Sequence, residues 1–405
     1  MTIDTNAQWD LKNYVTQNSV HISTIDPDST DYADLDAIGK AIGNSKIVML
    51  GEQDHGDAPT FLAKTRLIKY LHEKMGFNVL AFESDFFGLN FGFDKLEKNK
   101  SNIDTFLQKN IFPIWTYCNT CQNLFFNYVP YTCQTEKPLA ITGFDNQLIL
   151  NFSSKHLVFQ LDSLFQALDI SIVKQQNYKS EILPLIDSLK YYSFKDTANY
   201  SKCETYLNQI KKQVASKLNE NDFWMQVINS IVAENKEFRL QKIDYIMAGN
   251  IRDNQMASNL KWLTDVKFPK EKIIVWAANA HVAKYIDSSG KNGRKMISMG
   301  SYFTQNEKYL NDTYVIGFTS YEGEAGRLGF KTYSVPKPKS NGFENWINKS
   351  YKYSFVDFKT YNSKYPGEAD RFYLKGLGHN SAFEKEWTKT FDGIFFIREM
   401  YPCKR

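Results

Sequence analysis

Two short stretches of the sequence hold groups that could move protons. The stretch "LGEQDHG" contains Glu52 and His55, three positions apart, and "WAANAH" ends with Asn279 and His281. A histidine titrates near neutral pH and can take a proton from water, while a neighbouring carboxylate stabilises the imidazolium that forms. These residue types favour hydrolysis in which a general base activates water.

Two more carboxylates and one guanidinium extend this set. Glu83 ends the stretch "NVLAFE", and Asp145 follows "ITGF". Arg252, Met256 and Asn259 recur at i, i+4 and i+7, so a helix would place them on one face. An arginine there could grip a carboxylate or stabilise an oxyanion, and an exposed salt bridge is the alternative.

These polar residues follow short apolar runs that we predict to be buried strands. The runs cover residues 46–50, 78–83, 138–144, 272–278, 295–300, 313–318 and 392–397. Most are apolar on both faces, which is typical of parallel strands covered by helices. Ligands bind outside the carboxyl ends of such strands. The sequence therefore predicts an α/β fold with a mostly parallel central sheet flanked by helices, and a site at one edge.

The alternation of strands and helices stops between the third and fourth of these strands. Residues 151–265 read as helices throughout, with an apolar stripe from Leu207 to Leu218. We therefore predict a single α/β domain over residues 1–405 with a largely helical insertion at 151–265.

The segment after the first strand has a clear helical pattern. It predicts a helix that begins near Pro59 and ends at Gly76. His72 lies among charged neighbours on this helix, so we expect it to be solvated. Asp54 and Asp57 precede the helix, and we expect them to be solvated or to cap it. Three other histidines have no supporting pattern: His21, His156 and His379.

Composition excludes several classes of partner. The 405 residues include 49 basic and 45 acidic side chains, a balance too even to indicate a nucleic acid or a membrane surface as a partner. No run of about 18 apolar residues occurs. The N-terminal stretch lacks the features of a signal peptide, so we expect a cytoplasmic protein unless a leader has been removed.

The five cysteines give no clear signal. Their odd number argues against a complete disulfide framework. Cys118 and Cys121 form a CxxC, but no second CxxC or nearby histidine pair completes a zinc site. We expect two incidental thiols there.

Missing motifs narrow the chemistry further. GxSxG, GxxxxGK[ST] and GxGxxG do not occur, which argues against a serine nucleophile and a phosphate cradle. The two histidines and two glutamates could instead hold a divalent metal that activates water, although no HExxH spacing is present. A binding protein without turnover is the third alternative.

Six blocks of the sequence resemble, in order, those of the erythromycin esterase family. They are "GEQDHG", "LIKYLHEKMGFNVLAFES", "GFDNQ", "RDNQMASNLKWL", "VWAANAHV" and "MGSYF…YVIGF". The resemblance runs from about residue 45 to 320, with weaker echoes to about 397. It implies an α/β core with a deep cleft and a hydrolase that cleaves a small-molecule ester or lactone without a metal or cofactor.

The resemblance also implies roles for individual residues. The histidine of the first block acts as general base on water in this family, and that role falls on His55. The other positions that match the catalytic set are Glu52, Glu83, Arg252 and His281. We predict that four more residues bind the substrate: Lys64, Asp145, Met256 and Asn279.

Two positions depart from the family pattern. Ala278 stands where the fourth-strand block commonly has a histidine, and Lys64 stands where the macrolide esterases carry an arginine. A lysine keeps the charge but not the bidentate fork of an arginine. These departures favour a substrate other than a macrolide, as for the family members associated with succinoglycan synthesis.

Overall fold

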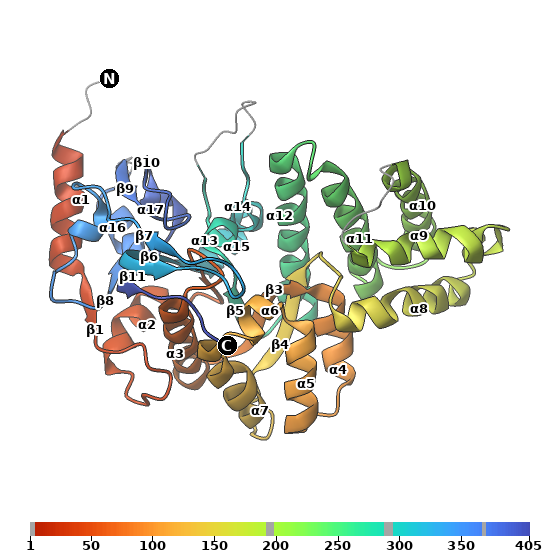
Figure 1. Ribbon diagram of the computed structural model, residues 1–405, viewed down its shortest axis with the longest axis horizontal. Coiled ribbons are helices and arrows are strands. Elements are labelled where there is room, and N and C mark those ends of the chain that lie inside the picture. The colour runs from red at the N-terminus through yellow and green to blue at the C-terminus, as the bar shows by residue number, and fades with distance from the viewer. Residues whose placement is uncertain (1–4, 192–197, 287–294, 367–369) are drawn as a thin grey trace.

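The computed structural model describes residues 5–191, 198–286, 295–366 and 370–405 (Figure 1). Within this part of the chain the central sheet has the strand order β1-β8-β11-β6-β2-β5-β3-β4, and β7 pairs with β6. In chain order the strands of this sheet are β1 Val20–Ile22, β2 Ile47–Leu50, β3 Phe77–Asp85, β4 Ala140–Asp145, β5 Lys272–Trp276, β6 Thr313–Ala325, β7 Tyr333–Val335, β8 Tyr353–Asp357 and β11 Gly393–Met400. A separate hairpin pairs β9 Phe372–Leu374 with β10 Phe383–Lys385.

The sheet is mostly parallel, as predicted. Strands β11, β6, β2, β5, β3 and β4 form a continuous parallel array, whereas β1, β7 and β8 pair antiparallel. All four residues of β2 are buried, and alternate side chains enter different cores: Met49 joins one cluster, and Val48 and Leu50 join the other. A strand buried on both faces must be apolar throughout, which explains the continuous apolar runs.

Helices cover both faces of the sheet. One core cluster receives side chains from α2 Asp36–Ile42, α3 Ala58–Met75, α5 Lys100–Asn110, α6 Pro113–Thr116 and α7 Val129–Thr132. The other receives side chains from α1 Thr5–Asn18, α14 Met299–Thr304, α15 Glu307–Asp312, α16 Phe358–Lys364 and α17 Trp387–Thr390, and from the helices between β4 and β5. Two further short helices are α4 Phe93–Lys95 and α13 Asn279–Val282.

The helices between β4 and β5 extend away from the sheet at one end of the molecule (Figure 1). They are α8 Asn151–Ala167, α9 Leu183–Asp187, α10 Ala198–Ala215, α11 Phe223–Leu240 and α12 Tyr245–Trp262. Most of the predicted stripe is buried here: Leu207, Ile210 and Val214 are each 2% exposed or less, whereas Leu218 is partly buried. That residues 151–265 form an insertion within a single domain stays a prediction.

The structure differs from the sequence prediction in one predicted strand and in five short strands that were not predicted. The strand predicted at 295–300 is wrong: Ser298 accepts a hydrogen bond from the Ser301 backbone N–H and caps α14. A short apolar run does not distinguish a strand from a buried helix, and Met299 is fully buried on α14. Strands β1, β7, β9 and β10 have only three residues each, too few for a pattern, and Ser354 and Asp357 interrupt the apolar residues of β8. None of these five strands was predicted.

The helix after the first strand was predicted correctly. Helix α3 spans Ala58–Met75, with a proline in its first turn, and Gly76 follows in the left-handed conformation with φ 72°. A residue with a Cβ is strained at this φ, so glycine suits the end of the helix.

In the described parts of the chain we find no helix with the length and apolarity needed to cross a membrane.

Candidate active site

The loop after β2 is held close to the loop after β5. A Cβ at Gly51 would lie 1.9 Å from Oδ1 of Asn279, so only a glycine permits this approach. The Asn279 N–H donates to the Glu52 carbonyl at 2.8 Å. The Asn279 side-chain amide donates to the carbonyls of Phe318 and Gly376, each at 2.7 Å. Asn279 therefore joins the loop after β2, strand β6 and the segment at Gly376 at the carboxyl edge of the sheet.

Glu52 is the centre of the first cluster in the site. Its Oε1 lies 2.7 Å from Nδ1 of His55 and accepts a hydrogen bond from Nε1 of Trp115 at 3.0 Å. Its Oε2 lies 2.7 Å from Nζ of Lys64. Glu52 and Lys64 are completely buried, whereas the His55 side chain is 16% exposed. The carboxylate thus fixes the imidazole through Nδ1 and leaves Nε2 without a hydrogen-bond partner among the described residues.

Lys64 contacts the site through Glu52. Burial lowers the pKa of Lys64, and the Glu52 carboxylate opposes this shift. Its Nζ also lies 3.9 Å from the centre of the Trp276 ring. The Lys64 ammonium is thus engaged by Glu52 and Trp276. In this structure Lys64 helps to position Glu52 and balances its charge.

Glu83 is the centre of the second cluster, at the end of β3. Its Oε1 lies 3.1 Å from Nη2 of Arg252 and 3.3 Å from Nε2 of His281. Its Oε2 accepts a hydrogen bond from the Ala278 N–H at 3.0 Å. Burial alone would raise the pKa of Glu83, but His281, Arg252 and His55 lower it to about 2. Glu83 is therefore ionised at neutral pH, and His55 is close enough to contribute to that.

His281 lies between two carboxylates. Its Nδ1 is 2.7 Å from Oδ1 of Asp253, and its Nε2 faces Glu83. Burial would lower the pKa of His281, but Asp253 and Glu83 raise it to about 9. His281 is thus an imidazolium at neutral pH, whereas a general base must be neutral to accept a proton.

Arg252 projects from α12 and connects the ends of two strands. Its Nε and Nη2 donate to the two oxygens of Asp145 at 3.1 and 2.6 Å, in a bidentate pair. The same Nη2 contacts Glu83, and the surrounding carboxylates raise the pKa of Arg252 further. The salt bridge considered from the sequence therefore exists, but it is buried within the site rather than exposed.

A cavity of about 200 Å³ opens beside the second cluster. Arg252, Asp253 and His281 line it on one side. Glu237 of α11 also lines it, and burial raises the pKa of Glu237 to about 7 although Arg252 opposes this shift. The apolar part of the wall consists of Ile246, Ile286, Met296 and Ile297.

The structure brings six of the nine predicted residues together and buries the other three beside them or in the core. The five proposed catalytic residues and Asp145 form the two clusters at the carboxyl edge of the sheet. Lys64 on α3 and Asn279 on α13 are buried against the loop after β2, and Met256 is fully buried in the core. Direct substrate contact by Lys64, Asp145, Met256 and Asn279 stays a prediction.

Sequence reasoning missed three residues of the site. Trp115, Asp253 and Glu237 contact or surround the catalytic candidates. Asp253 follows Arg252 directly in "RDNQ", which is a usable signal, because helical neighbours can face the same cavity. Trp115 and Glu237 reach the site only through tertiary packing, and nothing in their local sequence indicates it.

Two expectations about other charged residues were wrong. His72 is 7% exposed rather than solvated, and its Nδ1 lies 2.8 Å from the Tyr128 hydroxyl, because this side of α3 packs on the segment before α7. Asp57 is fully buried and makes no capping hydrogen bond; its Oδ1 lies 2.9 Å from Nε2 of His379. Asp54 is likewise engaged, by Arg327 and the Tyr333 hydroxyl.

His379, which had no predicted role, connects two further buried groups. Its Nδ1 lies 2.9 Å from Oγ of Ser320, and its Nε2 contacts Asp57. The order of groups is that of a Ser-His-Asp triad. Ser320 and Asp57 are 0% exposed and His379 is 2% exposed, so a substrate has no access to this serine.

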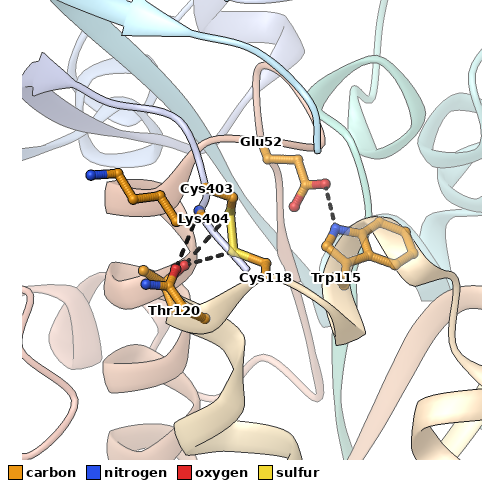
Figure 2. The surroundings of a disulfide bond; sticks show 7 residues. Glu52, Trp115, Cys118, Thr120, Cys403 and Lys404 are labelled. Atoms are coloured by element: carbon orange, nitrogen blue, oxygen red, sulfur yellow. Dashed lines mark hydrogen bonds between the residues drawn. A yellow bond between two sulfur atoms is a disulfide. The ribbon is translucent and has the colours of Figure 1, made fainter. Parts of the chain in front are cut away.

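The expectation of two incidental thiols is wrong for Cys118. It forms a disulfide with Cys403, 285 residues away in the sequence (Figure 2). The free cysteines are Cys121, Cys133 and Cys203. In the described residues, no group of three or more His, Cys, Asp or Glu side chains is arranged to hold a metal ion.

Solved structures share this fold across almost the whole chain. A Bacillus cereus protein superposes with a TM-score of 0.70 at 17% identity, covering 98% of each chain. A succinoglycan biosynthesis protein has a TM-score of 0.69 at 19% identity and covers 99% of each chain. A mutant of the erythromycin esterase EreC in its open conformation has a TM-score of 0.72 at 18% identity, over 96% of this chain and 98% of that one. These likenesses define a class of α/β proteins with one common fold.

Sequence comparison identifies the family within that class. The profile of the erythromycin esterase family matches residues 72–400, and the chain belongs to this family. The Bacillus subtilis (strain 168) protein YbfO, named provisionally as a hydrolase, is 26% identical over 330 residues, which are 75% of this chain and 71% of YbfO. The erythromycin esterase family, EreC and YbfO are named as hydrolases, in agreement with the chemistry expected from the strand-end residues.

Proposed function

We propose that this protein hydrolyses a small-molecule ester or lactone by general-base activation of water. One observation carries the proposal: Glu52 holds Nδ1 of His55 at 2.7 Å, while Nε2 has no partner among the described residues. An imidazole fixed in this way presents Nε2 to water as a candidate general base. Family membership supports hydrolysis as the reaction type.

The proposed reaction begins at His55. Its Nε2 takes a proton from water as the water oxygen attacks the acyl carbon, and Glu52 stabilises the resulting imidazolium. The carbon–oxygen bond to the leaving group then breaks, and the alkoxide receives the proton that His55 removed. General-base catalysis of this kind contributes about 10²–10⁴ in rate.

The second cluster supplies positive charge to the same reaction. Arg252 and His281 are cations at neutral pH, and both line the cavity. Cations held in a buried site stabilise the oxyanion that develops on the acyl oxygen. Glu83, Asp145 and Asp253 fix the two cations in place, so in this proposal they are positioning residues.

The nature of the acyl substrate follows from the walls of the site. Ala278 offers only a methyl group where the family commonly has a histidine, and Lys64 is occupied by Glu52. We therefore propose an ester or lactone other than a macrolide. A panel of acyl sugars, small esters, lactones and macrolides, scored by hydrolysis, would find the substrate class.

The variant His55→Ala tests the mechanism. Turnover of the best substrate should fall at least about 10²-fold, with an unchanged unfolding midpoint, because only the base is removed. His156→Ala is the matched control, since His156 is exposed and remote from both clusters. Full activity of His55→Ala would disprove the role of His55.

Two results would replace the proposal by an alternative. Activity that disappears with a chelator and returns with a divalent metal would favour a metal-dependent hydrolase. Ligand binding without hydrolysis of any panel compound would favour a binding protein. The variant Ala278→His is the companion test for the second case, because it restores the family residue.

A further inference from the structure

The disulfide between Cys118 and Cys403 lies beside the proposed catalytic pair. Cys118 follows α6, which carries Trp115, and the Cys118 N–H donates to the Trp115 carbonyl at 3.1 Å. The indole of Trp115 in turn donates to Glu52 at 3.0 Å (Figure 2). One sulfur of the bridge is therefore three residues from a side chain that holds the carboxylate of the pair.

The other sulfur is tied to the loop that carries His55. The Cys403 N–H donates to the carbonyl of Gly56, the residue after His55, at 2.8 Å. The Ala58 N–H donates to the Tyr401 carbonyl at 3.1 Å, and Asp57 pairs with Pro402. Residues 401–403 thus run along the first turn of α3 and the end of the catalytic loop.

The bridge is the covalent link between two segments that also share noncovalent contacts. The Asn119 N–H donates to the Lys404 carbonyl at 2.8 Å, and the Lys404 N–H donates to Oδ1 of Asn119 at 3.4 Å. The Arg405 guanidinium lies 5.5 Å from the centre of the Tyr117 ring. Residues 401–405 follow the last strand, β11, and are not part of the sheet. The covalent link therefore holds this segment against both the Trp115 segment and the His55 loop.

The neighbouring free thiol does not compete for the bridge. Cys121 is three residues beyond Cys118 and completely buried, and burial raises the pKa of its thiol well above the usual value. Disulfide exchange requires a thiolate, so Cys121 is a poor attacking group. The Cys118–Cys403 pairing should therefore persist in the oxidised protein.

We propose that Cys118 and Cys403 are positioning residues of the active site, and that reduction of their disulfide lowers turnover. This inference rests on the proposed role of Glu52 and His55. When a dithiol reduces the bridge, its thiolate attacks one cysteine sulfur, which forms a mixed disulfide and releases the other cysteine as a thiol. The second thiol of the dithiol then displaces the attacked cysteine. The S–S bond breaks, two cysteine thiols form, and the dithiol leaves as a cyclic disulfide, having supplied two electrons and two protons. Trp115 and the His55 loop then lose their common covalent link.

The experiment compares the oxidised protein, the protein treated with dithiothreitol, and the variant Cys118→Ser/Cys403→Ser. Oxidised wild type should turn over substrate about tenfold faster than the other two forms, through kcat rather than KM, because the base is misplaced and not the substrate. Dithiothreitol should have no effect on the double variant. Cys133→Ser is the matched control, since Cys133 is a free, half-buried thiol outside both segments, and its response to dithiothreitol should equal that of wild type.

Hydrogen exchange provides a readout that does not depend on catalysis. Reduction should speed amide exchange in residues 52–58 and 113–119 but leave β5 unchanged. Equal exchange and equal kcat in both redox states would overturn the inference, and so would a lower melting temperature with an unchanged kcat. If no ester is hydrolysed by any form, the proposed function fails while exchange still decides whether the bridge anchors the loop. If the double variant does not fold, the titration of wild type with dithiothreitol decides it alone.

Discussion

The two histidines of the site have nearly the same first contact but different surroundings. Nδ1 of each lies 2.7 Å from a carboxylate oxygen, of Glu52 for His55 and of Asp253 for His281. Glu52, however, shares its charge with the Lys64 ammonium, whereas His281 faces a second carboxylate, Glu83. The two histidines therefore differ in the charged groups around them rather than in their first contact. These surroundings make His281 a fixed cation and leave His55 as the candidate base.

The largest effect should come from breaking the Glu52 contact. In Glu52→Gln the carboxylate that fixes His55 is lost, and turnover should fall roughly 10³-fold because the imidazole loses its preferred tautomer. The variant also leaves the Lys64 ammonium buried without a counter-charge, which should lower the free energy of unfolding by roughly 3–5 kcal/mol. Turnover and urea unfolding measure the two effects.

A double variant separates those effects. Glu52→Gln/Lys64→Met removes both charges, so much of the stability should return while turnover stays low. If turnover recovered together with stability, Glu52 would act only in folding. The difference between the surroundings of His55 and His281 would then not explain catalysis.

The next largest effect concerns the charge on His281. Since its pKa is raised to about 9, the imidazolium that stabilises the oxyanion should disappear above that pH, and kcat/KM should decline there. In Asp253→Asn a principal source of the shift is gone, so the alkaline decline should move to lower pH. A pH profile of kcat/KM for both proteins measures this, and an alkaline limb that does not move would argue against the role of His281.

The same shift predicts how stability depends on pH. A pKa raised from 6.5 to about 9 means that the folded protein binds the proton more tightly than the unfolded chain. The contribution, about 3 kcal/mol at 1.36 kcal/mol per pH unit, is fully present below pH 6.5 and is lost as the pH rises through about 9. Glu83 behaves in the opposite sense, since its pKa is lowered from 4.5 to about 2.

Urea unfolding at several pH values tests that stability. Wild type should lose stability between pH 6.5 and 9, whereas His281→Gln, which cannot titrate there, should show a smaller loss over the same interval. Equal slopes in the two proteins would mean that other groups govern the alkaline unfolding.

The sequence allowed the edge of the sheet to be predicted better than the contacts across it. Continuous apolar runs identified β2, β3, β4 and β5, and the rule that ligands bind at strand ends then grouped Glu52, Glu83 and Asp145. Those inferences use only local pattern and topology.

Contacts between distant elements were beyond such reasoning. Lys64 meets Glu52 because one face of α3 packs beside the loop, and the Cys118–Cys403 bridge spans 285 residues. The sequence shows which groups exist, but not which of two nearby carboxylates receives a given cation. That choice depends on side-chain directions in the folded chain, and it decides that His281 is held as a cation between Asp253 and Glu83.

The smallest effect on turnover should come from the buried Ser320–His379–Asp57 cluster. It resembles a catalytic triad but belongs to neither of the two clusters of the site. His379→Leu leaves Asp57 and Ser320 buried without their partner, which should lower the free energy of unfolding by about 1–3 kcal/mol. Turnover should change by less than about threefold, because that factor is under 1 kcal/mol of barrier and no member of the cluster meets substrate. Ser320→Ala provides the decisive comparison with His55→Ala: if it reduced turnover as strongly, the nucleophile would be a serine reached by an opening of the loop at 376–381, and His55 would no longer be needed as the base.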